Sequence, residues 1–588
     1  MQVLKKILLI LVLVVASTQV LEAQQKKKQS KGKSTKKTTT TQSGATKKVN
    51  SNDAEDAAAK LEREALADTS NPKEVVITSA FKPSLKNAAK INFTAASTLT
   101  DTSRLQLLYK VPAQNLFFSY QPVPIKPIAI AMDSLVALKN DHFVKLGIGN
   151  FSTPYAEVGL SFGDGRNSIV NIHASHVSSN GQIDFQEFSK TGIDVFTQFI
   201  NSQEQEWTAK AFYKNSKQYL YGFQPSTLSY TKDDLLQRFN TIGFELGFRN
   251  KLMGVTGILY HPQISLINFS SNNHAKEMNL IAKFPFSKSF GKFYSFDVGL
   301  NADIATYNAP LIPNPIKIQN NLFTIDPNIR FKTPNFLLTL GVTPSWDNTN
   351  FKMLPNFGAS AKIKETGLLV ELGWKGYFQK NSYRSLAEFN PFLDKPDTIR
   401  NTRISEQYLG VKGSLGNHFS MGARLSFMQL FNQPLFVNTF SDGRAFNILY
   451  DSKIESIQIH GEIGYRIQEQ FSVIGGININ QYTSLSNYSK AYGLIPIEIT
   501  GSFKWKIWKD LQIKSEIYLR DGSPYQGKSF ESFKLDPAAD LNLGAEFSVL
   551  PKLNIWLQMN NLLNNTYQRW NQYQVMGFNV LGGVVYSF

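Results

Sequence analysis

Apolar and polar residues alternate with a period of two along much of the sequence after about residue 140. In residues 294–304, six apolar side chains occupy every second position, and Ser, Asp, Gly and Asn lie between them. Segments 242–249, 457–467, 511–520 and 541–548 repeat the pattern. Because successive side chains of a strand point to opposite faces, each segment predicts a strand with one apolar face and one polar face.

The charges in these five segments all fall on one face. Their apolar positions carry no charged residue, whereas the other positions carry ten. A Lys or Arg that faces lipid at the bilayer midplane costs about 2–4 kcal/mol, so the apolar face suits lipid and the polar face suits a lumen. The candidate lumen-facing residues are Glu245, Arg249, Asp297, Asp303, His460, Glu462, Arg466, Lys514, Glu516 and Arg520.

The lengths of the runs also favour a membrane barrel. The run 294–304 has eleven residues, which suits a tilted transmembrane strand of about 9–11 residues better than a soluble strand of about 5–6. Turn signals such as 163–167 and 508–510 imply antiparallel neighbours. At roughly 20 residues per strand and connection, 131–588 predicts an all-β antiparallel transmembrane barrel of about 22 strands, within a range of 16–24. The polar stretches 379–403 and 429–450 are expected to be extracellular loops.

The C-terminal segment forms one more alternating strand. Phe578, Val580, Val584, Tyr586 and Phe588 share a face. An aromatic C-terminal residue on such a strand is the usual address read by the barrel-insertion machinery. We therefore expect an insertion signal at Tyr586 and Phe588, with the barrel-assembly machinery and outer-membrane lipid as partners.

The N-terminal region is expected to export the chain. Residues 1–23 have a basic start at Lys5 and Lys6, a nine-residue aliphatic run and a cleavage site after Ala23, which together indicate a signal peptide. The run is too short for a membrane anchor, which needs about 20 apolar residues. Residues 24–71 are rich in Lys, Ser and Thr and predict a disordered basic tail with a short helix.

Composition excludes several classes of protein. The chain has no Cys, which rules out disulfides, thiolate metal sites and a lipid-modified cysteine. The net charge of +17 is concentrated in residues 1–48, where 11 Lys and one acid leave +10. A nucleic-acid-binding domain would carry its basic patch on a folded surface, so we expect no nucleic-acid partner.

The C-terminal part resembles a known family. Residues 553–567, with Asn-Leu-Leu-Asn at 561–564 and the aromatic Tyr567, and the final strand ending in Phe588 are similar to the end of TonB-dependent outer-membrane receptors. The resemblance implies a large barrel that transports a solute. A segment upstream resembles the TonB box, which pairs as an added strand with the energy-coupling protein TonB. Its residues are Glu74, Val75, Val76, Ile77 and Thr78.

One departure from that family concerns the plug domain. Only about 50 residues separate the TonB-box-like segment from the first predicted strand, and they include several prolines. We therefore expect 72–130 to be an extended periplasmic segment, with no plug. This leaves an open pore, a pore blocked by this segment or by loops, or a barrel that serves as a subunit of a complex with other periplasmic or outer-membrane proteins.

Enzymatic signatures are absent from the sequence. His173 and His176 are three residues apart on a predicted strand and would face opposite sides, so they cannot chelate one metal. No zinc or calcium signature and no phosphate loop occurs. We expect no catalytic residue, metal or cofactor.

Three functions remain open. The first is transport of a solute across the Gram-negative outer membrane, which the family resemblance favours. The second is a structural or partner-docking barrel without transport. The third is a secreted all-β binding protein.

Overall fold

The computed structural model describes residues 142–588, except for 224–226, 252–256, 311–313 and 364–366. The predicted signal peptide, basic tail and 72–130 segment, with the TonB-box-like Glu74–Thr78, lie outside the described residues. So do residues 131–141 of the predicted barrel.

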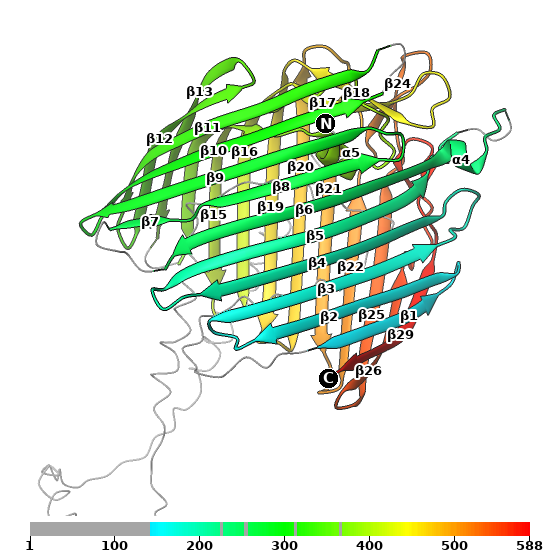
Figure 1. Cartoon of the computed structure of the whole chain (residues 1–588), viewed down its shortest axis with the longest axis horizontal. Helices are drawn as coiled ribbons and strands as arrows, with labels where there is room; N and C mark the ends of the chain where they lie inside the picture. Colours follow the sequence, from blue (N-terminus) through cyan, green and yellow to red (C-terminus); the bar gives the residue numbers. More distant parts are fainter. Residues whose placement is uncertain (1–141, 224–226, 252–256, 311–313, 364–366) are drawn as a thin grey trace, which may run out of the picture. The chain divides into compact units, whose positions relative to one another are not determined.

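The described strands form a closed antiparallel barrel (Figure 1). One sheet contains 23 strand segments, of which β7 and β8 both pair with β9 and follow each other around His261 and Pro262. They are therefore two parts of one barrel strand, which gives 22 barrel strands and confirms the predicted number. Each strand pairs with the next along the chain, and β29 closes the barrel against β1, with Gly583 opposite Gly147.

The barrel strands are β1 (Phe143–Gly149), β2 (Thr153–Gly163), β3 (Ser168–Ser179), β4 (Phe188–Ile200), β5 (Gln205–Tyr219), β6 (Leu236–Asn250), β7 (Ile258–Tyr260), β8 (Gln263–Ser271), β9 (Lys276–Phe290), β10 (Tyr294–Ala309), β11 (Ile316–Lys332), β12 (Phe336–Asp347), β13 (Asn350–Lys362), β14 (Leu369–Gln379), β15 (Thr402–Leu415), β16 (Phe419–Phe431), β19 (Ile454–Ile467), β20 (Phe471–Leu485), β21 (Ile497–Lys506), β22 (Leu511–Arg520), β25 (Ala538–Leu550), β26 (Leu553–Asn560) and β29 (Asn579–Ser587). The connections contain α4 (Lys232–Leu235), α5 (Tyr383–Phe389) and the strands β17 (Gln433–Asn438), β18 (Phe446–Asp451), β23 (Pro524–Gln526), β24 (Ser532–Lys534), β27 (Gln568–Trp570) and β28 (Tyr573–Gln574).

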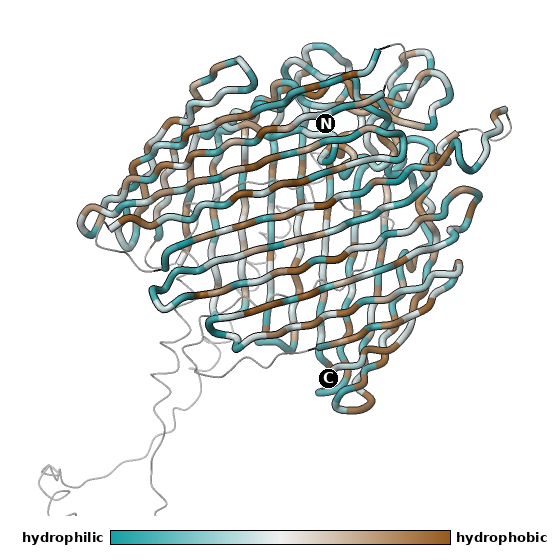
Figure 2. Tube along the Cα trace, viewed as in Figure 1, coloured by the Kyte–Doolittle hydropathy of each residue, from teal (hydrophilic) through white to brown (hydrophobic). Residues whose placement is uncertain are grey.

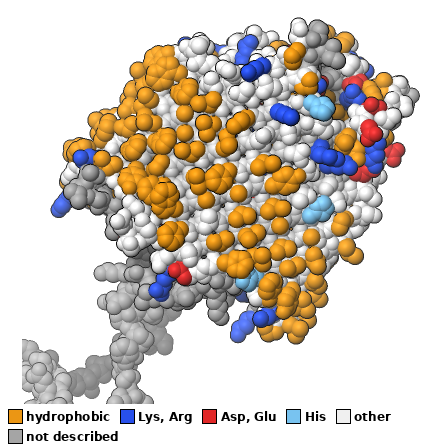
Figure 3. Space-filling model, in the orientation of Figure 1, with side chains coloured by type: hydrophobic (Ala, Val, Ile, Leu, Met, Phe, Trp, Pro, Cys, Tyr) orange, Lys and Arg blue, Asp and Glu red, His pale blue; other side chains and the backbone are white. Residues whose placement is uncertain are grey.

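The outside of the barrel is apolar. Ile463 is 58% exposed, and many other large apolar side chains at alternate strand positions are exposed as well. Figure 2 shows the alternation along the strands, and Figure 3 shows the apolar side chains spread over a wide area of the surface. A water-soluble monomer rarely exposes so much contiguous apolar surface, whereas a lipid-facing barrel requires it.

Several strands are longer than the sequence indicated. β11 has 17 residues and β10 has 16. The outward positions of β11 are apolar over Phe323–Phe331 but polar at Lys317, Gln319 and Asn321. The apolar stretch has the length of a membrane crossing, so the polar ends of these strands extend beyond the hydrocarbon layer.

Six connections have more than ten residues, and they follow β5, β14, β16, β20, β22 and β26. Counted around the barrel with β7 and β8 as one strand, these six strands all have odd places, so the six connections lie at the same end of the barrel. We call them together the loop cap: 220–235, 380–401, 432–453, 486–496, 521–537 and 561–578, without the undescribed 224–226. The polar stretches predicted as loops correspond to the second and third of these. No helix in the described residues is long and apolar enough to cross a membrane.

Candidate functional site

The barrel encloses a polar lumen. A cavity of about 2280 Å³ is lined by charged side chains of both signs from the inner strand faces and from the loop cap. Many of these charges are paired between strands: Lys210 Nζ lies 3.9 Å from Asp194 Oδ1, and Arg249 Nη2 lies 2.7 Å from Glu206 Oε2. Arg330 pairs with Asp297 in the same way. The cavity lining therefore carries charges of both signs, with neither sign dominating.

The residues predicted to face the lumen lie on three parts of the wall. Glu245, Arg249, Asp297 and Asp303 line the cavity. β19 carries His460, Glu462 and Arg466, and β22 carries Lys514, Glu516 and Arg520, all at positions that alternate with outward apolar residues. His460 Nδ1 lies within hydrogen-bond distance of Asn478 Oδ1, at 2.6 Å.

The two histidines of β3 have separate partners. His173 Nε2 lies 2.9 Å from Glu157 Oε1, and His176 Nδ1 lies 2.8 Å from Thr191 Oγ1. Their spacing places them on opposite faces of the strand. Within the described ranges, no group of three or more His, Cys, Asp or Glu side chains could hold a metal ion.

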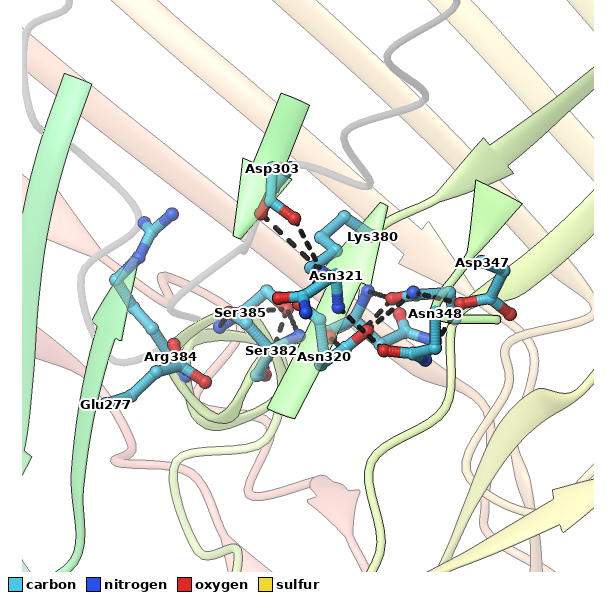
Figure 4. Close-up of polar contacts among 12 residues, drawn as sticks. Glu277, Asp303, Asn320, Asn321, Asp347, Asn348, Lys380, Ser382, Arg384 and Ser385 are labelled. Atoms are coloured by element: carbon cyan, nitrogen blue, oxygen red, sulfur yellow. Dashed lines mark hydrogen bonds and ion pairs between the residues drawn. The ribbon is translucent and has the colours of Figure 1, made fainter. Parts of the chain in front are cut away.

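A polar cluster attaches the cap connection 380–401 to the inside of the barrel (Figure 4). Lys380 Nζ lies 3.6 Å from Asp303 Oδ1 and also donates to the backbone oxygen of Asn320. Asn320 Nδ2 donates to the backbone oxygen of Asn381 at 2.7 Å. Asn401 Nδ2 donates to Asp347 Oδ1 at 2.8 Å. Three barrel strands, β10, β11 and β12, therefore anchor this connection.

The start of α5 is anchored by a buried carboxylate. Glu277 on β9 accepts hydrogen bonds from the backbone N–H groups of Tyr383 at 2.5 Å and Arg384 at 3.3 Å. The first N–H groups of a helix have no partner within the helix, so a carboxylate there satisfies them and interacts favourably with the helix dipole. Glu277 is 2% exposed, and this contact holds α5 against the barrel wall.

The cap has its own hydrophobic core. Phe392 and Tyr573 stack with ring centroids 3.5 Å apart, and Trp570 packs against Phe436 and Phe446. These residues come from three connections, and the same cluster includes Phe239 and Tyr307 of the barrel wall. Burial raises the pKa of Tyr573 well above its ordinary value, and its phenol donates to the backbone oxygen of Arg444. The cap is therefore a packed structure whose core reaches the inner wall of the barrel.

Of the residues that anchor the cap, the sequence analysis had named only Asp303, as a lumen-facing candidate. Glu277 could have been found from the sequence. Like Glu245, it is an acidic residue at a strand position that alternates with outward apolar residues. Asn320 and Asn401 gave none, since isolated asparagines occur in most loops and strand ends.

Comparisons with known proteins support the fold. No family model and no curated protein sequence matches the chain. Among solved structures, the FrpB iron transporter of Neisseria meningitidis matches with a TM-score of 0.61 and 11% identity, over 77% of this chain and 82% of that one. The pyoverdine outer membrane receptor FpvA of Pseudomonas aeruginosa matches with a TM-score of 0.59 and 11% identity, over 77% and 79%. The siderophore receptor PirA of Acinetobacter baumannii matches with a TM-score of 0.60 and 8% identity, over 77% and 81%.

These likenesses, at 8–11% identity, concern the fold. The described barrel shares its fold with these structures, which are TonB-dependent outer-membrane receptors and transporters. The chain is thus a multi-pass β-barrel of the Gram-negative outer-membrane type.

Proposed function

We propose that this barrel transports a solute across the outer membrane through its lumen. The observation that carries the proposal is the polar cavity of about 2280 Å³ inside a barrel of this fold. Its paired charges of both signs suit a hydrated solute, because a polar solute loses little hydrogen bonding when it leaves water for such a wall. The neighbouring structures are described as transporters and receptors, which supports the same class of function.

The loop cap is the proposed gate. Its core joins three connections to the inner wall, so a solute that passes this end has to displace packed side chains. Among the contacts that attach the connection 380–401 to the wall, Lys380 and Asp303 form an ion pair. Removing one partner of an enclosed ion pair leaves the other without compensation and costs several kcal/mol, on the order of 3–5. Loss of Lys380 should therefore release the connection 380–401.

Planar-bilayer recordings test this proposal. The wild-type chain should give small or infrequent conductance steps, and Lys380→Met should give larger or more frequent ones. Lys395→Met is the matched control, because Lys395 lies in the same connection and its Nζ contacts only the backbone oxygen of Pro310 among the described residues. Silence of the wild type and of Lys380→Met, with both correctly inserted, would count against transport.

We also propose that TonB powers the transport, on the strength of the sequence at Glu74–Thr78 alone. An added strand needs free backbone N–H groups and an extended conformation. Val76→Pro should therefore abolish energised uptake, whereas Val76→Ile should preserve it. Normal uptake by the proline variant would contradict the coupling.

A second function, partner docking, is favoured by a different observation. Phe440 and Phe530 are 70% and 69% exposed, and their rings stack with centroids 5.9 Å apart. They belong to the cap connections 432–453 and 521–537, and exposed aromatic residues are common at protein interfaces. A pull-down from detergent-solubilised envelopes would test this function. A stable partner that is lost from the double variant Phe440→Ser/Phe530→Ser, together with a silent barrel, would favour docking over transport.

A further inference from the structure

Two arginines lie close together where the cap meets the lumen. Arg520 is the last residue of β22 and is 3% exposed. Arg569 belongs to β27 in the cap and lines the cavity. Desolvation and, to a smaller extent, the neighbouring charge of Arg520 lower the pKa of Arg569 to about 10. The two arginines are also neighbours in space, because Arg520 donates to the backbone oxygen of Gln568, the residue that precedes Arg569.

The guanidinium of Arg520 is only partly satisfied. Its Nη2 donates to the backbone oxygen of Gln568. Its Nε and Nη1 have no hydrogen-bond partner in the described part of the chain. A buried donor without a partner costs about 1–3 kcal/mol, and native proteins contain few of them. Arg520 therefore keeps two donors that are available to a further acceptor.

The surrounding carboxylates do not balance the two arginines. Glu498 faces Arg520 across the β21–β22 ladder, and its charge interacts with both guanidinium groups. Asp540 accepts a hydrogen bond from Tyr567 at 3.1 Å instead. Elsewhere on the lumen wall, Arg249 and Arg330 each form an ion pair with a carboxylate. The pair Arg520 and Arg569 therefore carries an excess of positive charge in a place that is poorly hydrated.

Aromatic rings hold both guanidinium groups in place. Arg569 lies 4.2 Å from the Trp570 ring centroid and 5.6 Å from that of Phe389. Arg520 lies 5.1 Å from the Tyr567 ring centroid. Such contacts stabilise the cation and limit its movement, so the N–H groups are already oriented before a ligand arrives.

We propose that Arg520 and Arg569 form a binding site for the carboxylate or phosphate group of an anionic solute. Planar guanidinium groups bind both kinds of oxyanion through paired N–H donors. The site deepens the proposed transport function and rests on it, since it would hold the solute just below the gate.

Isothermal titration of the purified full chain in detergent tests the site. The probes are inorganic phosphate and acetate, each added at constant ionic strength against chloride. Phosphate, acetate or both should bind saturably, and the preferred probe identifies the source of the oxyanion. Arg569→Gln removes a charge-assisted hydrogen bond, and Arg520→Lys keeps the charge but cannot form a bidentate contact. Each variant should therefore weaken the binding about tenfold or more. Arg444→Lys is the matched control, since Arg444 lies in the cap but pairs with Asp442 at 3.1 Å; its affinity should equal that of the wild type.

A second measurement locates the site without relying on the arginine variants. Because Trp570 contacts Arg569, oxyanion binding should change the intrinsic fluorescence of the wild type, and Trp570→Phe should abolish that change. The proposal is overturned if neither probe binds, which would mean that water alone satisfies Arg520, or if binding survives both arginine substitutions. Failure of the site and failure of transport differ in outcome. Flux of neutral solutes without oxyanion binding refutes only the site, and oxyanion binding to a barrel without flux refutes only transport.

Discussion

A lysine placed on the outer face of β8 should destabilise the barrel far more than a lysine on its inner face. Leu266 is 42% exposed on the outside and lies between Phe244 of β6 and Leu280 of β9, which are also exposed and apolar. Its neighbour Ser265 lines the lumen. The two positions are adjacent, neither is charged, and each gains one positive charge on substitution by lysine.

The expected difference follows from the surroundings of the new ammonium group. A lysine costs about 2–4 kcal/mol at the bilayer midplane and about 0–1 kcal/mol near the interfaces. Leu266 is the last outward apolar position before Asn268, so we expect an intermediate cost of about 1–2 kcal/mol. Leu266→Lys should therefore lower the ratio of folded to unfolded barrel roughly 5- to 30-fold. In Ser265→Lys the ammonium group lies in the hydrated lumen, so we expect the free energy of unfolding to change by no more than about 0.5 kcal/mol.

Urea titration of the barrel refolded into lipid vesicles measures both variants. Heat-modifiable migration on gels reports the folded fraction, and tryptophan fluorescence provides an independent signal. Equal destabilisation of the two variants would refute the assignment of the two faces. So would a stable Leu266→Lys barrel, because lipid could not then surround that position.

Three further predictions concern the seam and the cap. Gly583→Ala should destabilise the closed barrel by about 1–3 kcal/mol, because the new Cβ would lie 1.9 Å from the backbone oxygen of Leu146. Gly582→Ala is the control and should fold normally, because the nearest atom to its new Cβ lies 3.6 Å away. The yield of the heat-modifiable form measures both variants. Tyr573→Ala removes a side chain that is 1% exposed and should cost the cap about 3–5 kcal/mol, seen as faster proteolysis within 561–578, whereas Leu563→Ala, at a position 52% exposed, should not. Phe530 has a φ of 64°, so Phe530→Gly should raise the thermal stability of its turn by about 1 kcal/mol, and a loss of stability would contradict this.

The faces of the barrel strands could be predicted because their signal is local. Leu300 and Asp303 lie three residues apart on β10, and their outward and inward directions follow from the period of two alone. The number of strands followed from the chain length for the same reason, since antiparallel neighbours need only short connections. The lengths of β10 and β11 did not follow, because their polar ends carry no alternation that separates a strand from a loop.

The cap could not be predicted because its contacts join distant parts of the chain. Phe392 and Tyr573 stack although 181 positions separate their numbers, and neither connection has a regular apolar pattern. The candidate oxyanion site shows the same limit. Arg520 was predicted to face the lumen, but its neighbour Arg569 lies in a connection whose course depends on the barrel strands around it.

The sequence by itself determined that this chain forms a large antiparallel barrel with an apolar outside and a charged inside, because side-chain direction in a strand depends only on position parity. Tertiary structure decided which inner charges are paired, how the six long connections pack into a cap, and where two arginines remain with too few carboxylates. These features depend on contacts between residues that are far apart in the sequence and that the closed barrel brings together. A local pattern of apolar and polar residues contains no information about such contacts.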